Sequence, residues 1–284
     1  MGPMRRSFVL LLAIFFALGS AAAAPKTIVV CAPGYPGNTE QAKPTMESFA
    51  RAAERAAGFP AGSLDAIYFE TEEAGVARLK DPGSALALVP LPFLLKHGVE
   101  LSLTPRLQVV EESGPSQVWT LVAKKGRIAS AASLAGWEVT GVPGYAPGFV
   151  RGPVLGEWGA LPGDARITFT SRPLSALRRA AAGEMVAVVL DGPQSAALAS
   201  LPFAADLEIV ARSKPLPGTI LCTVGESLAP DAAAPLIEGL IRLHEKEAGA
   251  EILKSMRMAR FEKADAASLE AIRRSFSAPP VSGR

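Results

Sequence analysis

The chain has 284 residues, of which 49% are hydrophobic, 20% charged and 6% aromatic, and its 26 glycines and 24 prolines are spread along the sequence. This composition argues against collagen-like repeats and low-complexity disorder. The 29 Lys and Arg nearly balance the 27 Asp and Glu, and the balance becomes exact if Arg5 and Arg6 leave with a targeting segment. A basic nucleic-acid-binding surface is therefore not expected.

The N-terminus has the three parts of a secretory signal peptide. Met1–Arg6 is positively charged, Ser7–Leu18 is apolar, and Gly19–Ala24 consists of small residues. The apolar run is too short to span a bilayer comfortably, which favours a cleaved signal over an uncleaved anchor. We expect cleavage near Ala23, which would remove residues 1–23 and leave a periplasmic protein.

Short apolar runs then alternate with helical segments. Most of these runs are rich in Val, Ile and Leu without strict alternation, as in strands buried on both faces. The predicted strands are Thr27–Ala32, Ala66–Glu70, Ala85–Val89, Gln108–Glu111, Trp119–Ala123, Trp137–Val142, Arg166–Thr170, Val186–Leu190, Leu207–Ala211 and Thr219–Val224. The predicted helices are Met46–Ala57, Leu174–Ala182, Ala232–Leu253 with Asp231 as N-cap, and Ala266–Phe276. This order predicts an α/β fold with mixed, mostly parallel sheets flanked by helices.

Two polar breaks that contain Pro and Gly divide the series. Glu112–Gln117 and Arg212–Gly218 each lie between two apolar runs and enclose a β/α series of their own. Two crossings at similar points would form a hinge beside a cleft. The predicted division is an inserted lobe at 118–212, a discontinuous outer lobe at 24–111 and 219–284, and hinge crossovers at 112–117 and 213–218.

Catalytic and metal chemistry has little support in the sequence. Cys31 and Cys222 either pair in an oxidising compartment or serve as small buried hydrophobes, and neither belongs to a C-x-x-C motif. His97 and His244 lack metal-ligand spacing, and no nucleophile elbow or phosphate-binding glycine motif is present. Asp191 follows a strand and would suit a general base, but without a partner residue it better suits a binding or hinge-facing role, or a loop cap. We expect no catalytic residue, no metal, no cofactor and no enzymatic activity.

More information lies in the loops that follow the strands, because ligands of open α/β sheets bind outside the carboxyl ends of the strands. Tyr35 and Tyr145, two of only three tyrosines, occupy matching loops, GYPG and GYAPG. They would either close on a ligand from opposite lobes or pack beside tight turns. Leu91 would either line the same cleft or pack in the core, and Arg151 would either pair with an acidic ligand or be solvated. The candidate ligand-binding residues are Tyr35, Gly37, Asn38, Thr39 and Leu91 from the outer lobe, and Tyr145, Gly148, Phe149 and Asp191 from the inserted lobe.

At these loops the chain resembles a known family. The segments VVCAPGYPGN, ALALVPLPFLL, WTLVAKKG, SLAGWEVTG, GYAPGFVR and GEMVAVVLDGP are similar to those of periplasmic substrate-binding proteins of the phosphate/phosphite/phosphonate ABC-transporter class. The similarity covers about residues 27–225. It implies the type II periplasmic-binding-protein fold, in which a ligand is trapped between two α/β lobes joined by two crossovers.

The chain departs from this family at the anion site. Members that hold a phosphonate use a Ser-Thr-Ser-Gly-like stretch, and the corresponding residues here are Tyr145-Ala146-Pro147-Gly148. The glycine is retained, but the hydroxyl triplet is absent and Pro147 has no N–H to donate. A desolvated dianion needs many donors, so the resemblance implies the fold and the binding role more strongly than a phosphate or phosphonate ligand.

The expected function is the solute-binding component of an ABC transporter, a monomer that delivers its ligand to an inner-membrane permease. Two alternatives stay open at this point: a periplasmic sensory module for a membrane signalling partner, and a small hydrolase or transferase on the same frame. Gene neighbourhood would separate transport from sensing. An enzyme would need a nucleophile–base pair, which the sequence does not supply.

Overall fold

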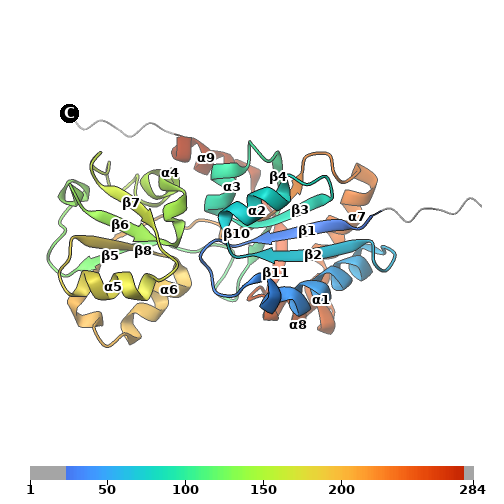
Figure 1. Cartoon of the computed structure of the whole chain (residues 1–284), viewed down its shortest axis with the longest axis horizontal. Helices are drawn as coiled ribbons and strands as arrows, with labels where there is room; N and C mark the ends of the chain where they lie inside the picture. Colours follow the sequence, from blue (N-terminus) through green and yellow to red (C-terminus); the bar gives the residue numbers. More distant parts are fainter. Residues whose placement is uncertain (1–23, 278–284) are drawn as a thin grey trace, which may run out of the picture.

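The computed structural model describes residues 24–277 and contains two β-sheets that lie side by side along the long axis of the molecule (Figure 1). The six-stranded sheet has the order β11-β4-β10-β3-β1-β2, and the five-stranded sheet has the order β7-β6-β8-β5-β9. Their strands are β1 (Lys26–Cys31), β2 (Leu64–Phe69), β3 (Ser84–Pro90), β4 (Leu103–Val110), β10 (Thr219–Val224) and β11 (Arg260–Lys263) in the first, and β5 (Thr120–Lys124), β6 (Glu138–Gly141), β7 (Arg166–Phe169), β8 (Val186–Leu190) and β9 (Leu207–Arg212) in the second.

Helices cover both faces of each sheet. The longer helices are α1 (Thr39–Ala57), α2 (Glu72–Leu79), α3 (Leu91–His97), α5 (Pro173–Ala181), α6 (Gly192–Ala197), α7 (Pro230–Ile241), α8 (Glu247–Ser255) and α9 (Ala266–Ser277), and a short α4 (Pro147–Phe149) lies between the helical turns η2 (Val142–Tyr145) and η3 (Val150–Val154). On the six-stranded sheet, α1, α7 and α8 share one core cluster, and α2 and α3 belong to the other. We call this sheet with these five helices the six-stranded half, and the other sheet with α4, α5 and α6 the five-stranded half.

Both sheets are mixed, and parallel pairing does not dominate as the sequence had suggested. Strand β1 pairs in parallel with β2 and β3, and β6 pairs in parallel with β7 and β8. Strands β10, β4, β5 and β9 pair antiparallel with their neighbours. These four strands adjoin the two chain crossings between the halves, so they enter their sheets from the opposite end to the β-α-β units.

The ten predicted strands are present, and the helices show where sequence patterns mislead. Helix α1 begins at Thr39, seven residues before the predicted start, because Asn38 caps it by accepting a hydrogen bond from the Gln41 N–H.

The predicted long helix after Asp231 is two helices, α7 and α8, and Asp231 lies inside the first turn of α7. The chain folds back between the two helices so tightly that a Cβ on Gly249 would lie 2.0 Å from the Leu243 carbonyl oxygen. The charged strand β11 had no apolar pattern to reveal it.

The two chain segments that connect the halves lie side by side. The backbone N–H of Gln117 donates to the Leu216 carbonyl at 2.8 Å, and the Leu216 N–H donates to the Gln117 carbonyl at 2.9 Å. This pair of bonds makes the two crossings one short antiparallel bridge.

Helix α9 returns the chain to the five-stranded half. It packs against α4 and η3, as seen at the top of Figure 1. A Cβ added at Gly152 would lie 2.1 Å from the Ser275 carbonyl oxygen, and one added at Gly148 would lie 3.0 Å from the Phe276 ring. The two glycines therefore form a notch in which the end of α9 sits.

Cys31 and Cys222 are both free and buried. They lie on β1 and β10, with β3 between these strands. Burial raises the pKa of each thiol to about 12. No helix within residues 24–277 is both long and apolar enough to cross a membrane, and the predicted signal peptide lies outside the described residues.

Candidate functional site

The loop after β1 meets the loop after β8 across the boundary between the two halves. The Tyr35 hydroxyl donates a hydrogen bond of 3.0 Å to Oδ2 of Asp191. Nearby, a Cβ on Gly34 would lie 2.8 Å from the Phe169 ring at the end of β7, so the two halves also touch by packing. The structure thus brings together two of the predicted residues, one from each side.

Asp191 is a buried carboxylate that the fold positions through a helix cap. It follows the apolar strand β8, is 3% exposed, and accepts the Gln194 N–H at 2.8 Å through Oδ1, which caps α6. No salt bridge among residues 24–277 includes Asp191. Burial raises the pKa of this carboxyl above its ordinary value, although the bonds from Gln194 and Tyr35 oppose the rise.

This raised pKa predicts a stability difference that depends on pH. Between the ordinary Asp pKa of about 4 and the raised value, the folded protein binds a proton that the unfolded chain has released, so ionisation of Asp191 destabilises the fold as pH rises. Asp191→Asn keeps the Oδ1 cap and removes the charge. We expect denaturant unfolding to show the variant gaining stability relative to the parent from pH 4 to pH 7. If the stability of the variant relative to the parent stayed constant or fell between pH 4 and pH 7, the prediction would be wrong.

Tyr145 lies in η2, close to Tyr35 and held from several sides. Its ring packs edge-on against Phe169 with centroids 6.2 Å apart, and its carbonyl accepts a hydrogen bond of 2.7 Å from Lys96 Nζ. The hydroxyl oxygen is buried, and no residue within 24–277 gives it a hydrogen-bond partner. Burial raises the pKa of the Tyr145 hydroxyl well above its ordinary value. Burial, followed by the charge of Asp191, also raises the pKa of Tyr35, and Tyr145 adds to that rise.

Two further polar residues border Asp191: Glu111, predicted as the end of a strand, and Gln117, predicted as part of a crossing. Burial, followed by the negative charge of Asp191, raises the pKa of Glu111. The side-chain oxygen of Gln117 accepts the Gly192 N–H at 2.9 Å. The position of these two residues beside the chain crossings was the feature that could have predicted their place in the site, because residues at the crossings approach both halves.

Three predicted residues at the start of α1 serve local structure. Asn38 is exposed and its side-chain oxygen caps the helix. Thr39 Oγ1 donates to the Tyr68 carbonyl at 2.9 Å and lies 3.2 Å from Oε2 of Glu70. Gly37 is exposed and has φ +109°, a left-handed conformation that favours glycine.

The remaining predicted residues pack in the core or against α9. Leu91 and Phe149 are fully buried, and Phe149 meets the Trp119 ring edge-on with centroids 5.2 Å apart. Gly148 lies under Phe276. Arg151 is neither solvated nor aimed at a ligand, because its guanidinium donates to three backbone carbonyls, those of Leu161, Pro162 and Ala165.

The histidines take part in local contacts. His97 lies 2.5 Å from Glu72 and 3.4 Å from Glu100, while His244 Nδ1 lies 2.9 Å from the Ile241 carbonyl. Within residues 24–277, no group of three or more His, Cys, Asp or Glu side chains could hold a metal ion.

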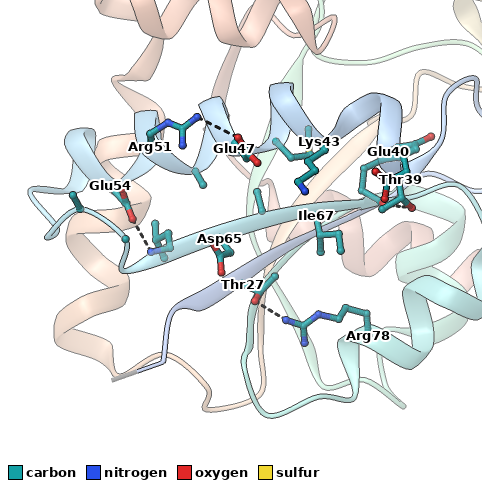
Figure 2. Close-up of a pocket in the computed structure, with 17 residues that line it drawn as sticks. Thr27, Thr39, Glu40, Lys43, Glu47, Arg51, Glu54, Asp65, Ile67 and Arg78 are labelled. Atoms are coloured by element: carbon teal, nitrogen blue, oxygen red, sulfur yellow. Dashed lines mark hydrogen bonds and ion pairs between the residues drawn. The ribbon is translucent and has the colours of Figure 1, made fainter. Parts of the chain in front are cut away.

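A groove with a volume of about 500 Å³ lies on the outer edge of the six-stranded sheet, between α1 and β2. Figure 2 shows the residues that line it. Of the predicted residues, only Thr39 lines it. Four of its charged side chains have local partners: Glu54 accepts the Leu64 N–H, Arg78 donates to Thr27, and Arg51 pairs with Glu47. This groove is a polar surface feature separate from the Tyr35–Asp191 contact.

Comparison with solved structures supports the same architecture. A binding protein of an ABC phosphonate transporter from Pseudomonas aeruginosa superposes with a TM-score of 0.60 at 16% identity, covering 88% of this chain and 85% of that one. PhnD1 from Prochlorococcus marinus, solved with methylphosphonate, gives 0.59 at 15% identity, covering 88% and 98%. A Xanthomonas citri protein solved with ATP gives 0.69 at 12% identity, covering 88% and 97%. At these identities the likeness establishes the fold, the two-lobed type II periplasmic-binding-protein fold.

A comparison with curated protein sequences finds no match. A family model described as the periplasmic substrate-binding protein of phosphonate ABC transporters matches residues 46–269. That range spans both halves and includes both crossings, the Tyr145 loop and Asp191. The chain therefore belongs to the family of periplasmic substrate-binding proteins of phosphonate ABC transporters.

Proposed function

We propose that the chain captures a small solute between its two halves and delivers it to a membrane permease. The observation that carries the proposal is the Tyr35–Asp191 hydrogen bond, which joins loops at the carboxyl ends of strands from both sheets. In this proposal the halves are the outer lobe (24–111 and 219–284) and the inserted lobe (118–212), except that α9 belongs to the outer-lobe range but docks on the inserted lobe. The mature protein is a monomer that begins near Ala24.

The two crossings would serve as the hinge. Segments 112–117 and 213–218 are short, lie side by side and are joined by the Gln117–Leu216 backbone bonds. Changes in backbone dihedrals within two such segments can rotate one lobe against the other without disturbing either sheet. Closure would bring Tyr35 and Tyr145 against the solute.

The ligand site favours a solute with less negative charge than a phosphonate dianion. In the stretch that corresponds to the anion-binding hydroxyls of the family, the Ala146 N–H donates to Pro143 and the Phe149 N–H donates to Ala146, both at 2.9 Å. Pro147 has no N–H. Asp191 and Glu111 add two carboxylates whose pKa values are raised. A dianion here would lack donors and face negative charge.

A thermal-shift screen of the protein from Ala24 onward tests the proposal. A ligand at 100 times its dissociation constant stabilises the folded state by about 2.7 kcal/mol. The panel contains methylphosphonate, inorganic phosphate, uncharged and aromatic solutes, and amino acids. We expect a shift with a solute of low negative charge. A shift with methylphosphonate alone would refute the proposed charge preference, and the absence of any shift would count against solute capture.

Replacing Tyr35 and Tyr145 together by Ala is expected to abolish ligand-induced closure, because the two phenol rings contribute from opposite lobes. Small-angle scattering with and without the solute found in the screen measures closure, and calorimetry measures affinity. Tyr68→Ala is the matched control, since Tyr68 is the third tyrosine and lines the groove on the edge of the six-stranded sheet instead. Unchanged affinity in the double variant would refute the assignment of the two tyrosines.

A further inference from the structure

A second polar contact joins the two halves at Tyr145. Lys96, near the end of α3 in the six-stranded half, donates from Nζ to the Tyr145 carbonyl oxygen in the five-stranded half at 2.7 Å. The same ammonium group lies 5.8 Å from the centroid of the Tyr145 ring. One side chain thus contacts both the backbone and the ring of a residue in the other half.

The ammonium group of Lys96 is held in place by its own half. Glu72 on α2 pairs with Lys96 at 2.5 Å, and the Glu72 side chain is only 16% exposed. The same carboxylate oxygen contacts His97, which also lies near Glu100, and Glu100 pairs with Lys80. Among the bonds of this network, the one from Lys96 to Tyr145 reaches the other half, and the others stay within the six-stranded half.

The Lys96 contact acts on the Tyr145 loop, and the residues on both sides of Tyr145 have little conformational freedom. Gly144, immediately before Tyr145, lies so close to β7 that a Cβ there would be 1.9 Å from the Thr168 carbonyl oxygen. On the other side, Ala146 and Phe149 are buried in the core. The bond from Lys96 to the Tyr145 carbonyl therefore holds the backbone that carries the ring from the opposite half.

We propose that Lys96 is a positioning residue of the ligand site, which holds Tyr145 from the opposite lobe before the ligand binds. The inference rests on the proposed function and adds to it a residue on α3, outside the loops that follow the strands. Lys96 does not touch the solute in this proposal. Lys96 acts through the Tyr145 backbone, and the ion pair with Glu72 fixes the direction of the Lys96 ammonium group.

The test compares Lys96→Met, Lys96→Arg and Lys80→Met without ligand. Lys80→Met is the matched control, because Lys80 pairs with Glu100 in the same network but stays in its own half. Hydrogen exchange of the segment 144–151 is measured together with the distance between spin labels placed one on each lobe. We expect Lys96→Met to raise exchange in this segment about fivefold, the size of one partly exposed charge-assisted bond, and to lengthen the label distance.

Arginine can donate to the same carbonyl, so Lys96→Arg should restore most of the protection, while Lys80→Met should match the parent. Equal exchange and equal label distances in Lys96→Met and Lys80→Met would overturn the proposal and leave Lys96 as an ion-pair partner of Glu72. Since no ligand is present, this result is independent of the solute screen. A failed screen with a positive exchange result would refute solute capture and leave the contact between the lobes intact.

Discussion

Replacing Phe149 by alanine is expected to lower the free energy of unfolding by about 3–5 kcal/mol, the usual cost of truncating a fully buried phenylalanine. Phe149 is 0% exposed and packs edge-on against Trp119, which is 2% exposed. Removing the ring leaves a cavity between α4 and the start of β5, and the surrounding strands cannot collapse into it. Chemical denaturation of the variant and the parent measures the difference.

Phe169→Ala is the matched control for this prediction. Phe169 is 47% exposed at the end of β7, so the same truncation removes much less buried surface there. We expect its cost to be less than half that of Phe149→Ala. If Phe149→Ala unfolded like the parent yet lost ligand affinity, the side chain would belong to the ligand site, as the sequence had suggested, and its core role would be wrong.

Gly152→Ala is expected to displace α9 and to cost about 1–3 kcal/mol, the range for overpacking a tight contact. An added Cβ would lie 2.1 Å from the Ser275 carbonyl oxygen, so η3 and α9 have to move apart. A backbone atom opposes the new methyl group, and no flexible side chain can rotate away to make room. Thermal unfolding gives the loss in stability, and hydrogen exchange of residues 266–277 shows whether α9 has loosened.

Gly163→Ala provides the comparison for Gly152→Ala. A Cβ at Gly163 would meet nothing within 4 Å, and this glycine is not among those with positive φ. It should therefore unfold like the parent, with unchanged exchange in α9. Equal stability of the two variants would show that α9 does not depend on the glycine notch.

Much of the sheet architecture was predictable because it depends on local apolar runs. The Val- and Leu-rich segments of β1, β3 and β8 can only be buried strands, and the polar crossings separate one sheet from the other. Strand direction was less predictable, since the direction of β4, β5, β9 and β10 follows from where the chain crosses between the halves. Strand β11, with the sequence RFEK, has a single buried residue and is recognisable only by its pairing with β4.

The candidate site was predictable where it follows strand ends and unpredictable where it depends on contacts across the halves. Tyr35 and Asp191 follow β1 and β8, and the topology brings such loops together. Asn38 has a side chain that suits both a ligand site and a helix cap, and in the structure it caps α1. Lys96, Glu111 and Gln117 have no distinctive motif, and their partners lie 49, 80 and 75 residues away in the chain.

The seating of α9 places the two ends of the described chain on different halves. Strand β1 begins at Lys26 in the six-stranded sheet, whereas Ser277 ends a helix docked against η3 (Figure 1). Fluorescent proteins fused before residue 24 and after residue 284 would therefore report relative movement of the lobes through energy transfer, with no insertion inside either domain. Because α9 docks in the glycine notch, the two ends of the described chain are suitable attachment points for a biosensor.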